Sequence, residues 1–316
     1  MSLLIRKPGI LTTVQDLGRF GHRSLGINPG GVMDRTATRL INVLVGNRES
    51  DAVLEMHFPA AEIEFEASAS FAVGGADMGA RLGGRKIENW RLHTADRGDI
   101  LSFSERVAGN RTYLAVGGGL LVDPWLGSRS TNLAAGVGGL DGRLLKAGDR
   151  VALRPSNRTL RGRNGRSISP AIVPPYRRSP TVRILAGAEL PLLDERSSSK
   201  FQDQAYSFTK DSSRMGVRLD AEPLALASPF EMVSAAVAFG TIQLFPDGQL
   251  VILMADHQTS GGYPRLGHVI GIDLPLIAQL GAGDEVRFRF VTIAEAEELS
   301  LAFEREMALF QTGCSF

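Results

Sequence analysis

The 316-residue sequence is poor in the residues that build disulfides and metal centres. It has one cysteine, Cys314, which excludes an intramolecular disulfide framework and a thiolate cluster, and this favours a reducing, intracellular setting. Its five histidines show neither a His-x-His nor an H-E-x-x-H spacing: His22, His57, His93, His257 and His268. We therefore expect no metal site.

Long hydrophobic runs are also missing. The first ten residues, "MSLLIRKPGI", lack the apolar stretch of a signal peptide, and no window approaches the ~20 apolar residues of a membrane span. The formal net charge is only +1, so the chain as a whole has no electrostatic drive towards nucleic acid or a membrane surface. We expect a cytoplasmic protein with neither as a partner.

Several catalytic and cofactor motifs are absent. No Gly-Lys pair occurs, which excludes a P-loop, and no G-x-G-x-x-G follows a strand-like run. There is no G-x-S-x-G elbow for a nucleophilic serine and no "AMKM"-like stretch for biotin attachment. We therefore expect no permanently bound cofactor, and any nucleotide or biotin chemistry has to involve other chains.

The dominant positive signal is a series of short apolar runs separated by Gly, Asp and Asn. Runs such as "ASFAVGG", "RTYLAVGG", "TVRILAG", "QLVILMA" and "DEVRFRF" have strand length and are rich in β-branched or aromatic residues. Their spacing favours barrels or sandwiches over a βαβ series. The chain is long enough for two domains.

Few helices are predicted. Asp34 can cap one that runs to Gly46, and residues 188–201 are a second candidate. A third spans about 292–310, where Thr292 and Glu295 form a capping box. Its apolar stripe predicts core packing and comprises Leu299, Ala302, Phe303 and Met307.

A basic, proline-rich segment lies near the middle of the chain. Residues 155–180 contain no acidic residue and six arginines: Arg158, Arg161, Arg163, Arg166, Arg177 and Arg178. A solvated linker is the favoured interpretation, and an arm for an acidic partner or nucleic acid is the alternative. We expect a first domain over 1–160, a linker over 161–180 and a second domain over 181–316 that includes the C-terminal helix.

A weak internal repeat supports two related halves. A Gly-Asp pair stands immediately before a strand-like run at Asp99, Asp149 and Asp284. The same pair is also a common turn, so it is suggestive only.

Four glycine-rich stretches concentrate polar groups, and each could simply shape a turn. "TTVQDLGRFGHRSLGINPGGVMDR" and "LGSRSTN" offer arginine forks and hydroxyl groups suited to an anionic small molecule. "SSRMGVRL" adds Arg214. "DHQTSGGYP", residues 256–264, carries far more polar groups than a hairpin turn needs.

Together these stretches resemble one family. "TTVQDLGR", "GVMD", "NVLVGN", "RTYLAVGGG", "LGSRST", "RMGVRL", "GTIQ" and "DHQTSGGYP" occur in the order found in the allophanate hydrolase subunit 2 family, also called the biotin-dependent carboxyltransferase A/B domain family. The resemblance covers about residues 3–290. It implies a mainly β fold of two cyclophilin-like β-barrels with a few peripheral helices.

The resemblance also implies several functions. Family members include the carboxyltransferase part of urea carboxylase, the partner of a sporulation-kinase inhibitor, and the C subunit of bacterial 5-oxoprolinase. A free-standing chain of this length is most similar to the last, which opens 5-oxoproline to L-glutamate with subunits A and B and with ATP used by the assembled complex. The alternatives are a regulator that sequesters the inhibitor, or a carboxyltransferase that uses carboxybiotin.

In such an enzyme the polar loops would form the substrate cleft. We expect the proton-transfer and hydrogen-bonding groups of the chemistry to be Asp16, Asp256, Gln258 and Thr259. The small acidic substrate would then be held by Gln15, Arg19, Asp34, Arg129, Ser130, Arg214, Gly261, Gly262 and Tyr263.

Overall fold

A computed structural model describes residues 1–155 and 165–315. The chain forms two compact units: the first contains Met1–Phe20, Gly30–Pro174 and Glu304–Phe316, and the second contains Gly21–Pro29 and Pro175–Phe303. The division differs from the expected one in that Gly21–Pro29 group with the second unit and residues from Glu304 onward group with the first. Three arginines of the basic segment 155–180, Arg158, Arg161 and Arg163, lie outside the described residues.

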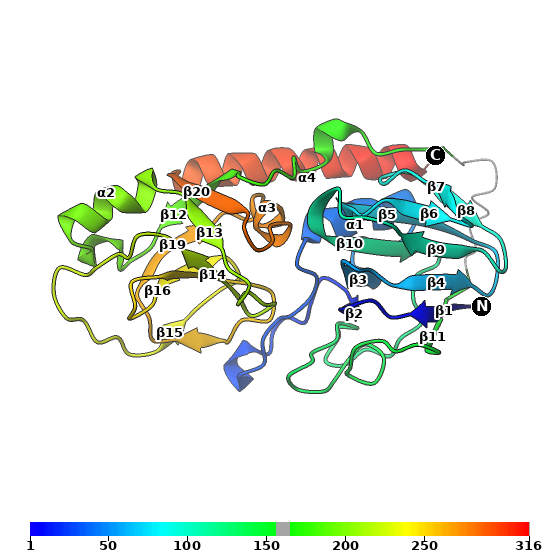
Figure 1. Cartoon of the computed structure of the whole chain (residues 1–316), viewed down its shortest axis with the longest axis horizontal. Helices are drawn as coiled ribbons and strands as arrows, with labels where there is room; N and C mark the ends of the chain where they lie inside the picture. Colours follow the sequence, from blue (N-terminus) through cyan, green and yellow to red (C-terminus); the bar gives the residue numbers. More distant parts are fainter. Residues whose placement is uncertain (156–164, 316) are drawn as a thin grey trace. The chain divides into compact units, whose positions relative to one another are not determined.

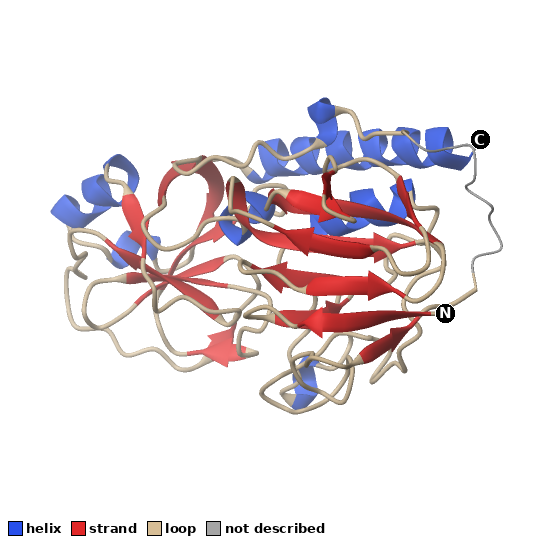
Figure 2. Ribbon diagram, turned by 45° about the vertical axis from the view of Figure 1, so that its right-hand side comes forward, coloured by secondary structure: helices blue, strands red, loops and turns tan. Residues whose placement is uncertain are grey.

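The strands of the first unit form two sheets (Figures 1 and 2). One has the order β11-β1-β4-β9-β6-β7, with β1 at Ser2–Lys7, β4 at Glu62–Phe65, β6 at Ala80–Leu82, β7 at Arg85–Lys86, β9 at Ile100–Phe103 and β11 at Arg150–Ala152. The other has the order β2-β3-β10-β5-β8, with β2 at Thr12–Gln15, β3 at Val53–His57, β5 at Ala69–Asp77, β8 at His93–Ala95 and β10 at Ala108–Val116.

One hydrophobic core joins these two sheets. Alternate residues of both contribute to it, as Leu3 and Ile5 of β1 and Leu54 and Met56 of β3 do, and all four are fully buried. This is the period-2 pattern of strands with one face inward. The first unit therefore packs its two sheets on a shared core, and the closed barrel expected for this half is not among its described sheets.

Helix α1 (Arg35–Leu44) lies against β5 and β10 of the first unit (Figure 1). Asp34 caps it as predicted, because its carboxylate accepts a hydrogen bond from the Ala37 amide at 2.8 Å. Gly46, with a φ of 79°, follows the helix in the left-handed conformation that glycine favours. Gly74 of β5 lets the helix approach, because a Cβ there would lie 2.5 Å from the Ile41 side chain.

The second unit contains a closed barrel in the order β12-β19-β16-β17-β14-β13-β20. Its strands are β12 (Thr181–Ala186), β13 (Tyr206–Phe208), β14 (Gly216–Asp220), β16 (Thr241–Leu244), β17 (Leu250–Leu253), β19 (Arg265–Val269) and β20 (Glu285–Phe290). A short pair, β15 (Ala235–Ala236) with β18 (Ser260–Gly261), lies outside the barrel. The mainly β fold class is confirmed.

The remaining helices differ in detail from the prediction. The candidate over 188–201 is two pieces, a 3-10 turn at Leu190–Leu192 and α2 (Glu195–Asp203), because Asp194 starts a new helix by accepting the Ser197 amide. Helix α3 spans Leu274–Ala278, and α4 runs further than expected, over Ile293–Ser315. The Thr292 hydroxyl accepts the Glu295 amide at 3.1 Å.

The predicted stripe of α4 is only partly buried. Met307 is buried and Leu299 and Phe303 are half-buried, whereas Ala302 is exposed. None of the helices in the described ranges combines the length and the hydrophobicity of a transmembrane span.

The Gly-Asp repeat proves to be one turn used three times. In each copy the aspartate carboxylate accepts the backbone amide three residues earlier: Asp99 from Asp96 at 2.9 Å, Asp149 from Lys146 at 2.7 Å, and Asp284 from Gly281 at 2.9 Å. The preceding glycines have φ values of 91°, 89° and 83°. Side chains of this geometry fix a tight turn before a strand.

Candidate functional site

Asp16 is the hub of the first polar cluster. It follows β2 directly, and its Oδ1 accepts hydrogen bonds from the Gly18 amide at 2.8 Å, the Ser128 hydroxyl at 2.6 Å and the Ser130 hydroxyl at 2.7 Å. Its Oδ2 accepts the Arg129 amide at 2.6 Å. The residue is 5% exposed. Both oxygens thus hold the loop after β2 to residues 128–130, and this is the geometry of a structural staple.

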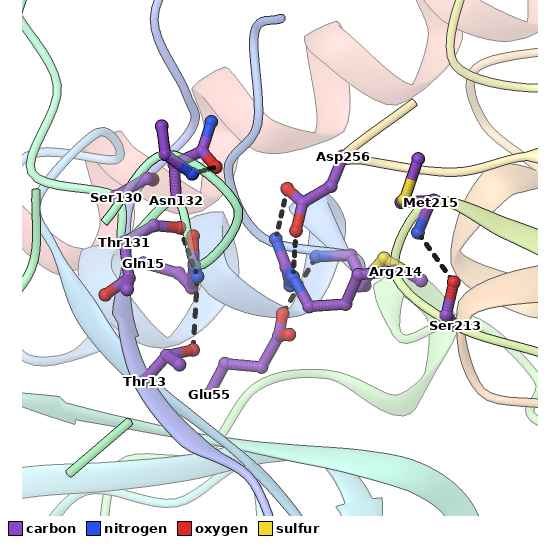
Figure 3. Close-up of polar contacts among 12 residues, drawn as sticks. Thr13, Gln15, Glu55, Ser130, Thr131, Asn132, Ser213, Arg214, Met215 and Asp256 are labelled. Atoms are coloured by element: carbon purple, nitrogen blue, oxygen red, sulfur yellow. Dashed lines mark hydrogen bonds and ion pairs between the residues drawn. The ribbon is translucent and has the colours of Figure 1, made fainter. Parts of the chain in front are cut away.

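Gln15 lies beside this staple and is fully buried. Figure 3 shows its amide between Thr13 and Thr131: Nε2 donates to the Thr13 hydroxyl at 3.1 Å and to the Thr131 carbonyl at 3.2 Å. The Thr131 carbonyl can only accept, so it fixes the nitrogen on that side. The buried Oε1 has no hydrogen-bond donor among the described residues. A ligand or water with an N–H or O–H group could supply one.

Arg19 has internal partners. Its Nη2 donates to the Ser130 carbonyl at 2.5 Å, and its guanidinium lies 5.0 Å from the centre of the Trp125 ring. Only 1% of the residue is exposed. The expected role as an anchor for a substrate carboxylate stays a prediction, and the structure places the Arg19 guanidinium in the interior of the loop cluster.

Close packing of glycine completes this cluster. Gly31, with a φ of 96°, lies so near the loop after β2 that a Cβ there would be 2.8 Å from the Gly18 nitrogen. Arg129 is half-buried and its Nε donates to the Val122 carbonyl at 2.9 Å. The structure therefore brings together Gln15, Asp16, Arg19, Arg129 and Ser130, as the sequence predicts for one loop-based site.

Asp34 stands apart from these residues in role. It is fully buried, caps α1 through its side chain, and donates its own amide to the Tyr113 hydroxyl at 3.0 Å. Burial raises the pKa of Tyr113 well above its usual value, and the nearby carboxylates of Glu55 and Asp34 raise it further. These contacts support the helix start, and substrate binding by Asp34 stays a prediction.

A buried polar row on the sheet beneath α1 was not predicted from the sequence. Thr13 on β2, Glu55 on β3 and Tyr113 on β10 are opposite one another in register, and all three are buried. The Glu55 Oε2 accepts the Met33 amide at 2.9 Å. The signal that could have revealed it is a lone acid inside the apolar run "VLEMH", since a buried acid needs a specific partner.

In the second unit Arg214 and Asp256 form a forked ion pair, which Figure 3 shows. Arg214 Nε lies 2.7 Å from Oδ2 of Asp256, and Nη2 lies 3.0 Å from Oδ1. The backbone adds a contact, because the Asp256 amide donates to the Arg214 carbonyl at 2.8 Å. Sequence reasoning placed Arg214 and Asp256 in one site, and they are in direct contact, but both carboxylate oxygens serve the arginine.

The stretch "HQTSGG" includes β18 and packs through Gly261 against β16 of the barrel. Gln258 is exposed and Thr259 is half-buried, whereas His257 is buried. Gly261 packs on the buried Gln243 of β16: a Cβ at this position would lie 2.7 Å from the Gln243 Nε2. Gly261 and Gly262 are not among the described glycines with positive φ. The close approach of residue 261 to Gln243, rather than a left-handed backbone, therefore favours a residue without a Cβ at this position.

Gly262 and Tyr263 border a cavity of about 640 Å³ in the second unit. The Tyr263 ring packs on Phe245, with 4.4 Å between the ring centres and 32° between the ring planes. No group of three or more His, Cys, Asp or Glu suited to a metal ion occurs among the described residues.

Comparisons with known proteins support the family resemblance. The family model described as "Carboxyltransferase domain, subdomain A and B" matches residues 25–290. The chain is 35% identical to the C subunit of 5-oxoprolinase from Haemophilus influenzae over 91% of its length and 90% of that protein. It is 37% identical to the C subunit of 5-oxoprolinase from Escherichia coli, over 93% of both chains.

A solved structure is also similar along nearly the whole chain. Urea amidolyase of K. lactis matches with a TM-score of 0.91 and 27% sequence identity. The match covers 98% of this chain but only 20% of the urea amidolyase chain.

Proposed function

The chain belongs to the carboxyltransferase family of subdomains A and B, and from that membership we propose that it is the C subunit of a 5-oxoprolinase. Together with subunits A and B it would open 5-oxo-L-proline to L-glutamate, and the assembled complex would use ATP. Hydrolysis of this cyclic amide breaks the ring C–N bond, and water supplies the oxygen of the new carboxyl group.

The single observation that supports this proposal most is end-to-end similarity to two relatives of that name. Both alignments cover at least 90% of each chain, so this chain has the size of a free-standing C subunit. The lack of a P-loop fits a division of labour in which another subunit handles ATP. We further propose that the protein is cytoplasmic.

Within this complex we assign substrate contacts first to side chains that are at least partly exposed. Gln258 is exposed, Thr259 and Arg129 are half-buried, and their amide, hydroxyl and guanidinium groups suit a lactam with a carboxylate. Asp16 and Asp256 are already held by several donors, so a proton-transfer role for either requires those contacts to loosen.

The test is reconstitution with matched subunits A and B, in which ATP-dependent glutamate formation is measured with and without this chain. Gln258→Ala and Thr259→Ala should each lower turnover about ten- to a hundred-fold, the effect of losing one hydrogen bond to a charged group in the transition state. Their thermal stability should be unchanged. Gln202→Ala, an exposed glutamine on α2, is the matched control. No activity with matched partners would refute the proposal.

A second candidate is the carboxyltransferase component of a urea or amide carboxylase, which would use carboxybiotin. Its support is the structural match to urea amidolyase, in which the similar region is about a fifth of the chain. Carboxyl transfer from carboxybiotin to urea, absent without this chain, would favour it over ring opening. A regulator that sequesters a kinase inhibitor is the remaining alternative, and normal growth of a deletion strain on 5-oxoproline as nitrogen source would favour it.

A further inference from the structure

The cavity beside Gly262 and Tyr263 has an unusual lining for a site expected to hold an acid. Three aromatic side chains border it, Phe230, Phe245 and Tyr263, and Met232 and several aliphatic residues complete its walls. Tyr263 is 38% exposed and Phe230 is 42% exposed, so the aromatic surface is accessible to a ligand. A cavity of about 640 Å³ has the size of a small-molecule site.

The electrostatics of this lining favour positive charge. Aromatic faces carry a negative quadrupole and attract cations within about 6 Å of the ring centre. The described lining residues include no lysine, arginine or histidine, and Glu231 is their only charged member.

The Arg218 guanidinium lies close to one of these rings, but it does not change this conclusion. The Arg218 guanidinium lies 5.8 Å from the Phe245 ring centre, does not line the cavity, and is paired with Asp247. The described lining offers a carboxylate no cation, and its charged member is itself an acid, so this lining suits a cation better than an acid.

We propose that this cavity binds an organic cation, an ammonium group on an apolar body, with the ammonium against the aromatic faces and within the field of Glu231. The apolar body would occupy the wall formed by Met232 and the aliphatic residues. This site goes beyond the proposed function and does not rest on it, because the ring-opening substrate is an anion.

Three probes of similar size and different charge test the charge preference on the full chain. Benzylammonium, benzyl alcohol and benzoate are titrated separately and their binding is followed by ligand-observed NMR. We expect benzylammonium to bind at least ten-fold more tightly than benzoate, with benzyl alcohol between them. Benzoate binding that equals or exceeds benzylammonium binding would overturn the proposal, and so would displacement of benzylammonium by 5-oxoproline.

Two variants locate the binding. Glu231→Gln should weaken benzylammonium several-fold and leave benzyl alcohol unchanged, because only the charge is removed. Tyr263→Leu keeps apolar volume but loses an aromatic ring, so it should weaken binding of benzylammonium more than binding of benzyl alcohol. If this variant unfolds, Phe230→Leu replaces it, because Phe230 is the more exposed side chain. Glu297→Gln, beside a different groove of the same unit, is the control. Unchanged benzylammonium affinity in Glu231→Gln would refute the assignment.

Discussion

The Asp16→Asn variant tests whether the Asp16 carboxylate is a structural staple between two loops or an acid–base group in the reaction. The carboxylate accepts four hydrogen bonds of 2.6–2.8 Å, three on Oδ1 and one on Oδ2. An asparagine side chain has only one accepting atom. With its NH2 group at the Oδ2 position it faces the Arg129 amide, donor against donor, and the opposite orientation would disrupt three contacts.

The magnitude follows from the smaller of these losses. At least one charge-assisted hydrogen bond disappears and a buried donor is left unpaired, which costs ~2–4 kcal/mol in the free energy of unfolding. For a unit of this size each kcal/mol lowers Tm by ~2–4 °C, so the expected decrease is ~4–16 °C.

The assay is thermal and urea unfolding of Asp16→Asn beside wild type, with turnover of the reconstituted complex measured well below the variant's Tm. Asp194→Asn is the control, because asparagine caps a helix as well as aspartate and little change is expected. If Asp16 is a structural staple, Asp16→Asn should be less stable than wild type, and its folded form should retain turnover. Wild-type stability with abolished turnover would refute the staple and support the acid–base role.

Three further predictions concern the second unit. Arg214→Lys keeps the charge but loses the fork on Asp256, so it should lower the free energy of unfolding by ~1–3 kcal/mol in urea titrations, and wild-type stability would contradict this. Gly261→Ala should lower the free energy of unfolding by ~1–3 kcal/mol, because the new Cβ displaces the buried Gln243 amide. The crystal structure of the variant would check that shift. Gly262→Ala should cost less stability, because its Cβ would meet only contacts of 3.3 Å and longer. The two hydrogen bonds from the Arg265 guanidinium lower the pKa of Glu189. This pair therefore stabilises the fold above the unfolded-state pKa of ~4.3, and the stabilisation is lost as pH falls through the lower folded-state pKa. In Glu189→Gln the decline in unfolding free energy below pH 5 should therefore be shallower than in wild type, and an identical decline would exclude this pair as a source of acid sensitivity.

Much of the architecture could be predicted from the sequence because it depends on local patterns. Runs such as "TVRILA" and "DEVRFRF" form strands where their β-branched and aromatic residues indicate, and Asp34 starts α1 because its side chain reaches an amide three residues ahead. The repeated Gly-Asp turn is equally local. The break between Leu190–Leu192 and α2 was not predicted, because residues 188–201 are expected as one helix although Asp194 can start a new one.

The sequence also showed which loops are rich in polar residues. It did not show which hydrogen-bond or ion-pair partner each of these side chains has. The sequence by itself determined the mainly β fold, the start of α1, the family membership and the loops that gather polar groups. Only the tertiary structure decided that Asp16 and Asp256 are held by several donors, that Arg19 is buried against Trp125, and that the described lining of the cavity at Tyr263 lacks a cation. The reason is that strand and cap formation depend on neighbours along the chain, whereas the hydroxyl partners of Asp16 are more than 100 residues away from it.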